Sequence, residues 1–302
     1  KEQDNLDYAL QIPTIMNHVD NESVSVFRSQ TKYAEYYGSE TEGDWYGSMS
    51  DVLISEMYMV NVNQSDTIVY EGQTVHTDSV PITIYPGWNW ISYLGQRSMG
   101  LNDLLSSLNP ESGDLIKSKT AFSMYASETL GWLGTLSTMN SGEGFMMKSA
   151  NSGTLVYPES SMYSGGSFRM DMNQSPESIW DLDPARYENS MNIIAEIDHP
   201  DFLRPHAANV LGAFTENNCL GNIALTPIDG EKSLYFLTVY GQEDYPIHFN
   251  YFDPQKQRVY KAENKLSFEA NKLVGTIENP YPISIIEESN NSALFDISIY
   301  PN

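Results

Sequence analysis

The sequence predicts a mainly β protein in which two repeated β-rich units, each with one short helix, precede an antiparallel β-sandwich. Three observations lead to this fold class. The chain of 302 residues is rich in tyrosine and in turn formers, with 20 Tyr, 20 Gly and 15 Pro. One long stretch of the first half occurs twice. Short apolar strands separated by polar turns fill the second half.

The repeat emerges when the segment from Phe27 is aligned with the segment from Ile116. Matching residues lie 89 positions apart before a turn and 87 positions apart after it, which is one two-residue deletion. Matches in one order with one small gap indicate a duplicated module. The matched pairs include Ser29/Ser118, Thr31/Thr120, Tyr33/Phe122, Tyr36/Tyr125, Trp45/Trp132, Gly47/Gly134, Ser50/Ser137, Glu56/Glu143, Met59/Met146 and Thr67/Thr154.

A short amphipathic helix is predicted upstream of each matched stretch. In the second repeat a leucine stripe has i, i+3, i+4, i+7 spacing and is followed by the stop signals Pro110 and Gly113. The first repeat carries the same stripe 89 residues earlier, with Pro13 near the tolerated first turn. The two stripes are Leu101, Leu104, Leu105 and Leu108, and Ile12, Ile15, Met16 and Val19.

A strand over residues 82–94 opens the second repeat, and its counterpart in the first repeat would lie before Lys1. We therefore expect the chain to begin inside a domain. The predicted domains are residues 1–73 (first repeat), 74–163 (second repeat), 164–287 (sandwich) and 288–302 (a linker and the start of a further domain).

Regularly spaced strands make up the third region, and their number is typical of an immunoglobulin-like antiparallel sandwich. Polar or Gly/Pro/Asn turns separate them. The predicted strands are 190–198, 208–216, 219–228, 233–241, 246–253, 257–262 and 265–270.

The charge balance excludes some partners. With 40 Asp and Glu against 16 Lys and Arg, the formal net charge is −24, so nucleic acid and anionic membrane surfaces are repelled at long range. Such a surface attracts cations, and Asp181 and Asp183 are weak calcium candidates. Their spacing lacks the oxygen series and central Gly of a dedicated loop, which favours an Asp-Pro turn. The lone Cys219 opens an apolar strand, where a structural thiol is expected.

The sequence contains no nucleophile elbow, phosphate loop or dinucleotide fingerprint, so no catalytic residue and no organic cofactor is assigned. Trp45 and Trp132 are candidate sugar-stacking residues, because indole faces bind apolar sugar faces. Repeated aromatics more often build the core of a repeat, and we favour that interpretation. Alternation similarly places Trp88 and Trp90 on one face, expected to be buried.

Three stretches carry a resemblance to known families. Residues 86–148, from "PGWNWIS" through "SGDLIK" and "GWLG" to "GEGFMMK", resemble a module common in large surface proteins of Bacteroidota. Residues 187–278 resemble a second module that often accompanies it. The ending "ISIYPN", with Tyr300, Pro301 and Asn302, resembles the start of the C-terminal sorting domain of type IX secretion cargo. The first repeat departs from the pattern, since Ser-Glu-Met-Tyr-Met replaces Gly-x-Gly-Phe-Met at residues 55–59.

The resemblance implies export across the outer membrane to the cell surface or medium. Its implied partners are the type IX translocon and attachment machinery, with glycans or other surface proteins as further candidates. "DTI" and "DSV" also fit the O-glycosylation pattern of these bacteria, at Thr67 and Ser79.

We expect a non-catalytic stalk, display or adhesion region of a larger cargo protein, with an enzymatic domain upstream left open. The alternative is a set of carbohydrate-binding modules appended to a secreted hydrolase, which predicts exposed, coplanar rings at Trp45 and Trp132. A third alternative, an enzyme within these residues, predicts a cleft where acids or histidines converge.

Overall fold

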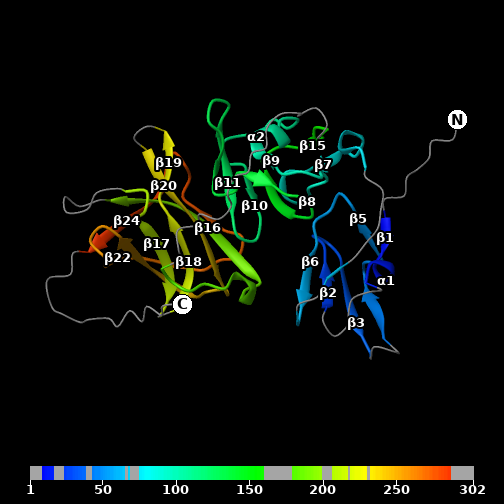
Figure 1. Cartoon of the computed structure of the whole chain (residues 1–302), viewed down its shortest axis with the longest axis horizontal. Helices are drawn as coiled ribbons and strands as arrows, with labels where there is room; N and C mark the ends of the chain where they lie inside the picture. Colours follow the sequence, from blue (N-terminus) through cyan, green and yellow to red (C-terminus); the bar gives the residue numbers. More distant parts are fainter. Residues whose placement is uncertain are drawn as a thin grey trace. The chain divides into compact units, whose positions relative to one another are not determined.

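The computed structural model confirms the mainly β fold class. It describes residues 9–16, 24–38, 43–64, 67–68, 75–159, 179–198, 206–216, 218–229 and 232–286. The chain divides into two compact units, Lys1–Met170 and Asp171–Asn302, and the first of these contains both repeats (Figure 1).

A five-stranded antiparallel sheet with the order β12-β11-β10-β14-β8 forms the second repeat. Two short pairs, β7 with β15 and β9 with β13, accompany it. The strands are β7 (Ile82–Ile84), β8 (Gly87–Ser92), β9 (Met99–Gly100), β10 (Leu115–Lys117), β11 (Phe122–Ser127), β12 (Gly131–Gly134), β13 (Thr138–Met139), β14 (Gly144–Ser149) and β15 (Gly153–Leu155). Buried apolar residues, Leu101, Ile116 and Phe145 among them, form one core beneath these strands.

The first repeat has a four-stranded sheet with the order β4-β3-β2-β6, and a separate pair of β1 with β5. Its registers are those of the second repeat: Phe27 pairs with Val60 as Ile116 pairs with Met147. The predicted duplication is therefore also a duplication of hydrogen-bond register. The strands are β1 (Ala9–Gln11), β2 (Val24–Arg28), β3 (Tyr33–Tyr37), β4 (Asp44–Gly47), β5 (Asp51–Leu53) and β6 (Met59–Val62).

Each repeat carries one helical turn, shorter than the apolar stripe that predicted it. These turns are α1 (Ile12–Ile15) and α2 (Leu101–Leu104), and Pro13 takes a first-turn position. The first helical amide is bonded in the same way in both: Ile12 N donates to Ser50 O over 3.1 Å, and Leu101 N to Ser137 O over 3.0 Å. The structure thus repeats the way each helix is anchored to the strands.

The predicted strand 82–94 is interrupted by a turn at residues 85–87, which sends β7 and β8 into different sheets. Gly87 has a φ of 96°, a conformation that favours glycine. The side chain of Asn89 holds the turn, because its amide nitrogen donates to Tyr85 O over 2.8 Å and its oxygen accepts from Tyr85 N over 2.8 Å. One correction follows: Asn89 and Ile91 face the core, while Trp88 and Trp90 share the opposite face and are half-buried.

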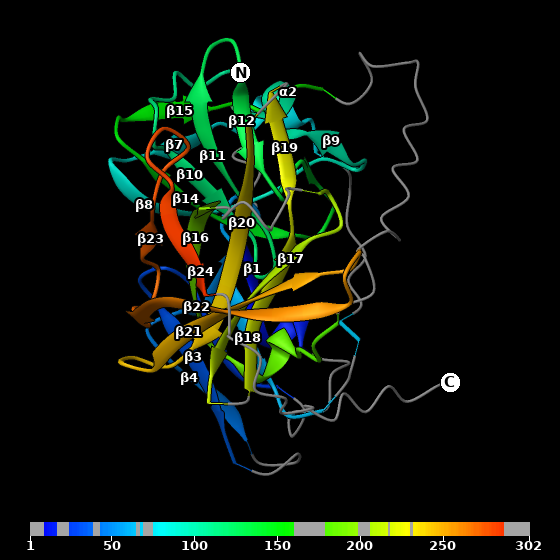
Figure 2. The same cartoon turned by 90° about the vertical axis from the view of Figure 1, so that its left-hand side faces the viewer.

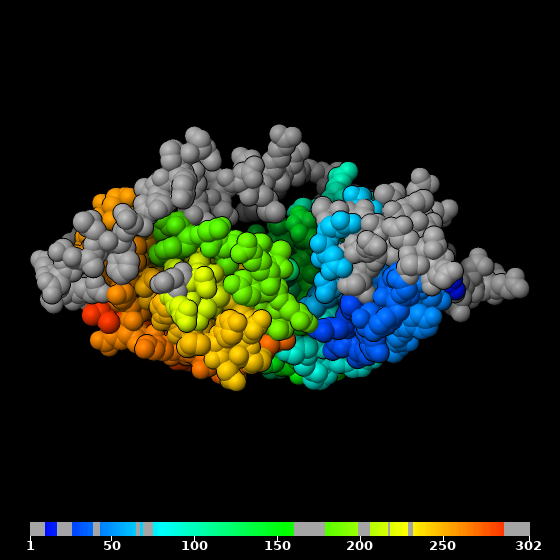
Figure 3. Space-filling model, turned by 90° about the horizontal axis from the view of Figure 1, so that it is seen from below, coloured from blue at the N-terminus to red at the C-terminus, as the bar shows by residue number. Residues whose placement is uncertain are grey.

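The second unit is a sandwich-like arrangement of nine strands among its described residues, in the order β18-β17-β21-β22-β24-β16-β20-β19 with β23 beside β16. Facing apolar side chains, including Ile193, Leu237 and Phe249, make one core. Long strand β20 runs across β21 and β22 in Figure 2, and the surface of this unit is coloured from light green to orange-red in Figure 3. The strands are β16 (Asn189–Asp198), β17 (Val210–Thr215), β18 (Asn218–Ala224), β19 (Thr226–Asp229), β20 (Lys232–Gly241), β21 (Pro246–Asp253), β22 (Arg258–Ser267), β23 (Leu273–Val274) and β24 (Tyr281–Ile286).

Two details of this unit differ from the sequence prediction. The segments 257–262 and 265–270 belong largely to one strand, β22, whose register with β21 shifts between His248 and Asn250. Strands β23 and β24 pair parallel to β16, whereas the prediction was antiparallel throughout. Among the described residues, no helix has the length and apolarity needed to cross a bilayer.

Candidate functional site

The repeated tryptophans pack against the cores of their repeats. Trp132 is 8% exposed and belongs to the core of the second repeat, and Trp45 packs half-buried against the core of the first. Tyr36 meets Trp45 edge to face with ring centroids 5.5 Å apart, and Tyr125 meets Trp132 in the same way at 5.5 Å. The same aromatic pair thus holds β3 to β4 and β11 to β12, which is the core role that the sequence analysis favoured.

An exposed aromatic face lies elsewhere in the first repeat. Tyr33, Tyr37 and Tyr46 on β3 and β4 are each at least half exposed. The rings of Tyr37 and Tyr46 meet edge to face at 6.1 Å, and the Tyr37 hydroxyl donates to Glu35 over 2.7 Å. Hydrogen bonding to Glu35 raises the pKa of the Tyr37 hydroxyl. Sequence analysis missed this face because tyrosine alternation also fits a core strand.

A buried lysine joins two of the motifs in the second repeat. Lys117, on β10, is 3% exposed, and its ammonium lies 5.5 Å from the centre of the Trp88 ring on β8. Burial lowers the pKa of Lys117 to about 8. The "GWNWIS" and "GDLIK" motifs therefore meet through a cation–π contact. Buried lysines with lowered pKa values also occur as nucleophiles, but here the Trp88 ring covers the Lys117 ammonium.

The two repeats touch along the outer edge of β8. Gln30 of the first repeat donates from its amide nitrogen to Trp88 O over 2.7 Å and accepts from Trp90 N over 2.9 Å. Residues 54–57 continue this contact, since Ser92 N donates to Ser55 O over 3.3 Å and Glu56 bridges to Ile91. Backbone groups of an edge strand, which otherwise need water, are thus bonded by the neighbouring repeat.

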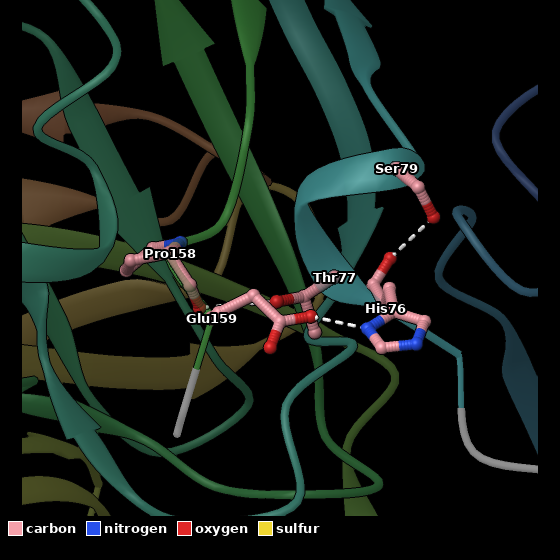
Figure 4. Close-up of polar contacts among 5 residues, drawn as sticks. All are labelled: His76, Thr77, Ser79, Pro158 and Glu159. Carbon is pink, nitrogen blue, oxygen red and sulfur yellow. Dashed lines mark hydrogen bonds and ion pairs between the residues drawn. The ribbon is translucent and has the colours of Figure 1, made fainter. Parts of the chain in front are cut away.

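Where the chain enters and leaves the second repeat, a polar cluster joins the two segments (Figure 4). His76 Nδ1 lies 2.7 Å from Glu159 Oε1, and Thr77 Oγ1 donates to Pro158 O over 3.0 Å. The hydrogen bond with Glu159, followed by the charge of that carboxylate, raises the pKa of His76. These contacts hold the segment that enters the second repeat against the segment that leaves it.

His76, Asp78 and Glu159 are also the one group of three metal-capable side chains found among the described residues, with ligand atoms within 4.8 Å of one another. Imidazole and carboxylate donors suit zinc and related ions. His76 and Asp78 are exposed, and a metal would have to replace the hydrogen bond between His76 and Glu159. We therefore interpret the contact between His76 and Glu159 as a clasp, a polar link between the two chain segments at the ends of the second repeat.

The calcium candidates lie apart from this cluster. Asp183 caps the short 3-10 turn at Pro184–Arg186, accepting from Ala185 N over 3.0 Å and pairing with Arg186 at 3.3 Å. Asp181 is exposed two residues earlier. Asp183 thus makes the Asp-Pro turn favoured by the sequence, and the calcium assignment stays a prediction.

The remaining predicted sites are also placed or left as predictions. Thr67 and Ser79 are exposed, and the Ser79 hydroxyl donates to His76 O over 2.7 Å. Cys219 lies partly buried on β18, where burial raises the pKa of its thiol. Tyr300, Pro301 and Asn302 lie outside the described residues.

We compared the chain with protein families, curated proteins and solved structures. No protein-family model, no curated protein and no solved structure matches this chain.

Proposed function

We propose that the chain is a non-catalytic stalk, display or adhesion region of a larger secreted surface protein exported by type IX secretion. The observation that carries the structural half of this proposal is the contact of Gln30 and residues 54–57 with the edge of β8. It connects two copies of one module through main-chain hydrogen bonds, and a contact of this kind supports a stiff spacer.

The sequence motifs of the second repeat that carry the resemblance also support the proposal, because their side chains make contacts within the fold. Trp88 covers Lys117, Asn89 holds the turn before β8, and Asp114 accepts from Ala150 N over 2.8 Å. These roles maintain a scaffold and leave the side chains engaged with the fold. The proposal of export rests on the resemblance of residues 297–302 to a sorting segment.

The spacer function can be tested by measuring how rigidly the first repeat is held against the second. Cysteines introduced for Ser48 and Glu128, in a Cys219→Ser background, would carry spin labels for distance measurement by pulsed electron resonance. We expect one narrow distance distribution that broadens in Gln30→Ala and stays narrow in Lys119→Ala, which changes the repeat counterpart of Gln30. A broad distribution in the parent protein would contradict the spacer.

Export is tested separately with the natural producer. Antibodies raised against Asp171–Asn302 should label intact cells or detect the protein in the medium. Labelling confined to permeabilised cells contradicts the proposed location without affecting the spacer.

A second function, carbohydrate binding, is favoured by one observation, the exposed face of Tyr33, Tyr37 and Tyr46. Aromatic rings beside a carboxylate suit the apolar faces and hydroxyls of sugars. A glycan array with the parent protein decides between the functions. Binding that disappears in Tyr37→Ala/Tyr46→Ala but survives in Tyr85→Ala, an exposed tyrosine outside this face, would establish the second function.

A further inference from the structure

The outer face of four neighbouring strands in the second unit gathers aromatic, amide and basic side chains. These strands are β18, β17, β21 and β22, in that order across the sheet. The alternate residues Leu211 and Phe249 belong to the core, so the residues between them along each strand face outward. Residues paired across strands share a face, and the registers give two adjacent outward rows. The rows are Cys219, Phe214, His248 and Lys265, and Asn222, Gly212, Asn250 and Lys261.

The aromatic end of this face is built around Gly212. A Cβ at Gly212 would come within 2.7 Å of the Trp180 ring, which therefore lies directly over β17. Trp180 meets Phe214 edge to face with ring centroids 5.1 Å apart, and Phe214 stacks on His248 at 5.9 Å. The amide nitrogen of Asn222 donates to Trp180 O over 3.4 Å and so anchors this residue. Trp180 and His248 stay partly exposed, so a ligand can reach both rings.

The opposite end of the face is basic. Lys261 and Lys265 are exposed on β22, and a register shift places them opposite two successive outward residues of β21, Asn250 and His248. Burial lowers the pKa of His248, and the charges of Lys265 and Lys261 lower it further, so both ammonium groups lie near the imidazole. Residues 171–302 contain eight Lys and Arg against twenty Asp and Glu. The lysine pair is therefore a local positive charge within an acidic unit.

The distribution of charge along the face indicates which ligand fits. Burial and, to a smaller extent, the charge of Asp181 raise the pKa of Cys219, so this carboxylate lies at the Trp180 end. Both lysines lie two strands from Gly212 or Phe214, which is roughly 10 Å. An anionic group is thus attracted to β22 and repelled from the Trp180 end. Strands β17 and β21 are paired on both edges, so a peptide cannot add to them as a further strand.

We propose that the outer face of β17, β21 and β22 binds an acidic saccharide, in which one sugar carries a carboxylate and its neighbours are neutral. The carboxylate would accept hydrogen bonds from the ammonium groups of Lys261 and Lys265. The Asn250 amide would meet hydroxyls, and the apolar face of a neutral sugar would lie against the Trp180 ring. This site lies in the other unit from the exposed tyrosines of β3 and β4, and it depends on neither of the functions proposed above.

Two trisaccharides that differ only in one carboxylate test the site on the complete chain. One ends in glucuronic acid and the other in glucose, and NMR titration follows the ring resonances of His248 and Trp180. We expect saturable shifts with the acidic trisaccharide. The neutral one should bind at least about tenfold more weakly, because hydrogen bonds between charged groups are lost.

Variants matched in charge locate the contact. Lys261→Gln/Lys265→Gln should weaken binding of the acidic trisaccharide at least about tenfold. Lys256→Gln/Lys272→Gln removes the same charge from exposed residues outside this face and should change the affinity by less than about twofold. Glu263→Gln should strengthen binding, because Glu263 is exposed in the bulge between the two lysines and its charge opposes a carboxylate. Thermal unfolding should show that all variants fold like the parent.

Five outcomes would overturn the proposal. The first two are an absence of saturable binding and equal affinity for the two trisaccharides. The third is an equal loss in both lysine pairs, which would mean that binding follows the overall charge. The fourth is tighter binding of pentaglutamate than of the acidic trisaccharide, which would assign the face to an acidic peptide. The fifth is loss of binding in Tyr37→Ala/Tyr46→Ala, which would move the site to the first repeat.

Discussion

The first and second repeats have the same strand register but different amounts of core. The core of the second repeat takes fifteen buried apolar residues, from Ile82 to Tyr157, whereas that of the first takes six among the described residues, from Ile12 to Met49. Some of the added residues come from β7, β8 and β15, and others lie on β12, β13 and β14, whose counterparts in the first repeat are less covered. Register is thus set by local pairing within the shared strands, while burial depends on the strands that cover them.

The largest expected effect comes from removing matched core side chains. Phe145→Ala empties a fully buried site and should lower the free energy of unfolding by about 3–5 kcal/mol. Its counterpart change, Tyr58→Ala, removes a half-buried ring and should cost roughly 1–2 kcal/mol. Urea unfolding followed by fluorescence measures both. Equal losses would mean that the first repeat is covered as fully as the second.

Lys117→Met should stabilise the protein at pH 7 by roughly 1–3 kcal/mol, because a buried ammonium is replaced by an apolar chain. The lowered pKa of Lys117 also makes the stability of the parent protein depend on pH. The unfolded chain binds more protons between about pH 8 and 10.5, so the stability of the parent rises across that window and the gain from the variant shrinks. Arg28→Met, the exposed counterpart, should change stability by less than about 0.5 kcal/mol. Thermal unfolding at several pH values checks both, and a loss of stability in Lys117→Met at pH 7 would contradict the burial.

Gln30→Ala tests whether the repeats are coupled through the β8 edge. Loss of two hydrogen bonds to Trp88 and Trp90 should cost about 1–2 kcal/mol and speed amide exchange at Trp90. Lys119→Ala is the matched control, since its position in the second repeat corresponds to Gln30. Unchanged exchange at Trp90 would show that this amide is protected in another way.

The smallest effect is expected at the clasp between His76 and Glu159. The raised pKa of His76 means that the pair contributes stability below about pH 6.5, and that this contribution is lost as the pH rises through the pKa of the folded state. Glu159→Gln should lower the pKa of His76 toward 6.5 in an NMR titration. Addition of zinc to the parent is the companion measurement, and a zinc-dependent shift of His76 resonances that Asp78→Asn removes would show a metal site in place of a clasp.

Sequence patterns predicted the local parts of this structure well. The offsets of 89 and 87 identify paired residues whose strands share one register, and Asp183 makes the Asp-Pro turn expected of it. Alternation also placed Trp88 and Trp90 on one face, but it does not say which face is covered. That choice is made by Asn89, whose side chain turns inward to hold residues 85–87.

Long-range features of the site escaped sequence analysis. Lysine is almost never fully buried, so nothing in "GDLIK" marks Lys117 as covered by a ring that precedes it by 29 positions. Gln30 bonds to residues 58 and 60 positions away, and no periodicity reports such a contact. The exposed tyrosines were missed for the same reason, because exposure depends on which strands cover a face.

The glycines at the ends of β4 and β12 bear on the ancestry of the module. Gly47 and Gly134 have φ values of 151° and 154°, and a Cβ at either would come within 2.2 Å of a backbone oxygen, that of Tyr33 or Phe122. Neither copy can exchange this residue without moving the strand beside it, although many neighbouring positions have diverged since the duplication. We therefore expect mutation to change this glycine slowly in both copies, and it provides an anchor for tracing how further copies descended from the same ancestor.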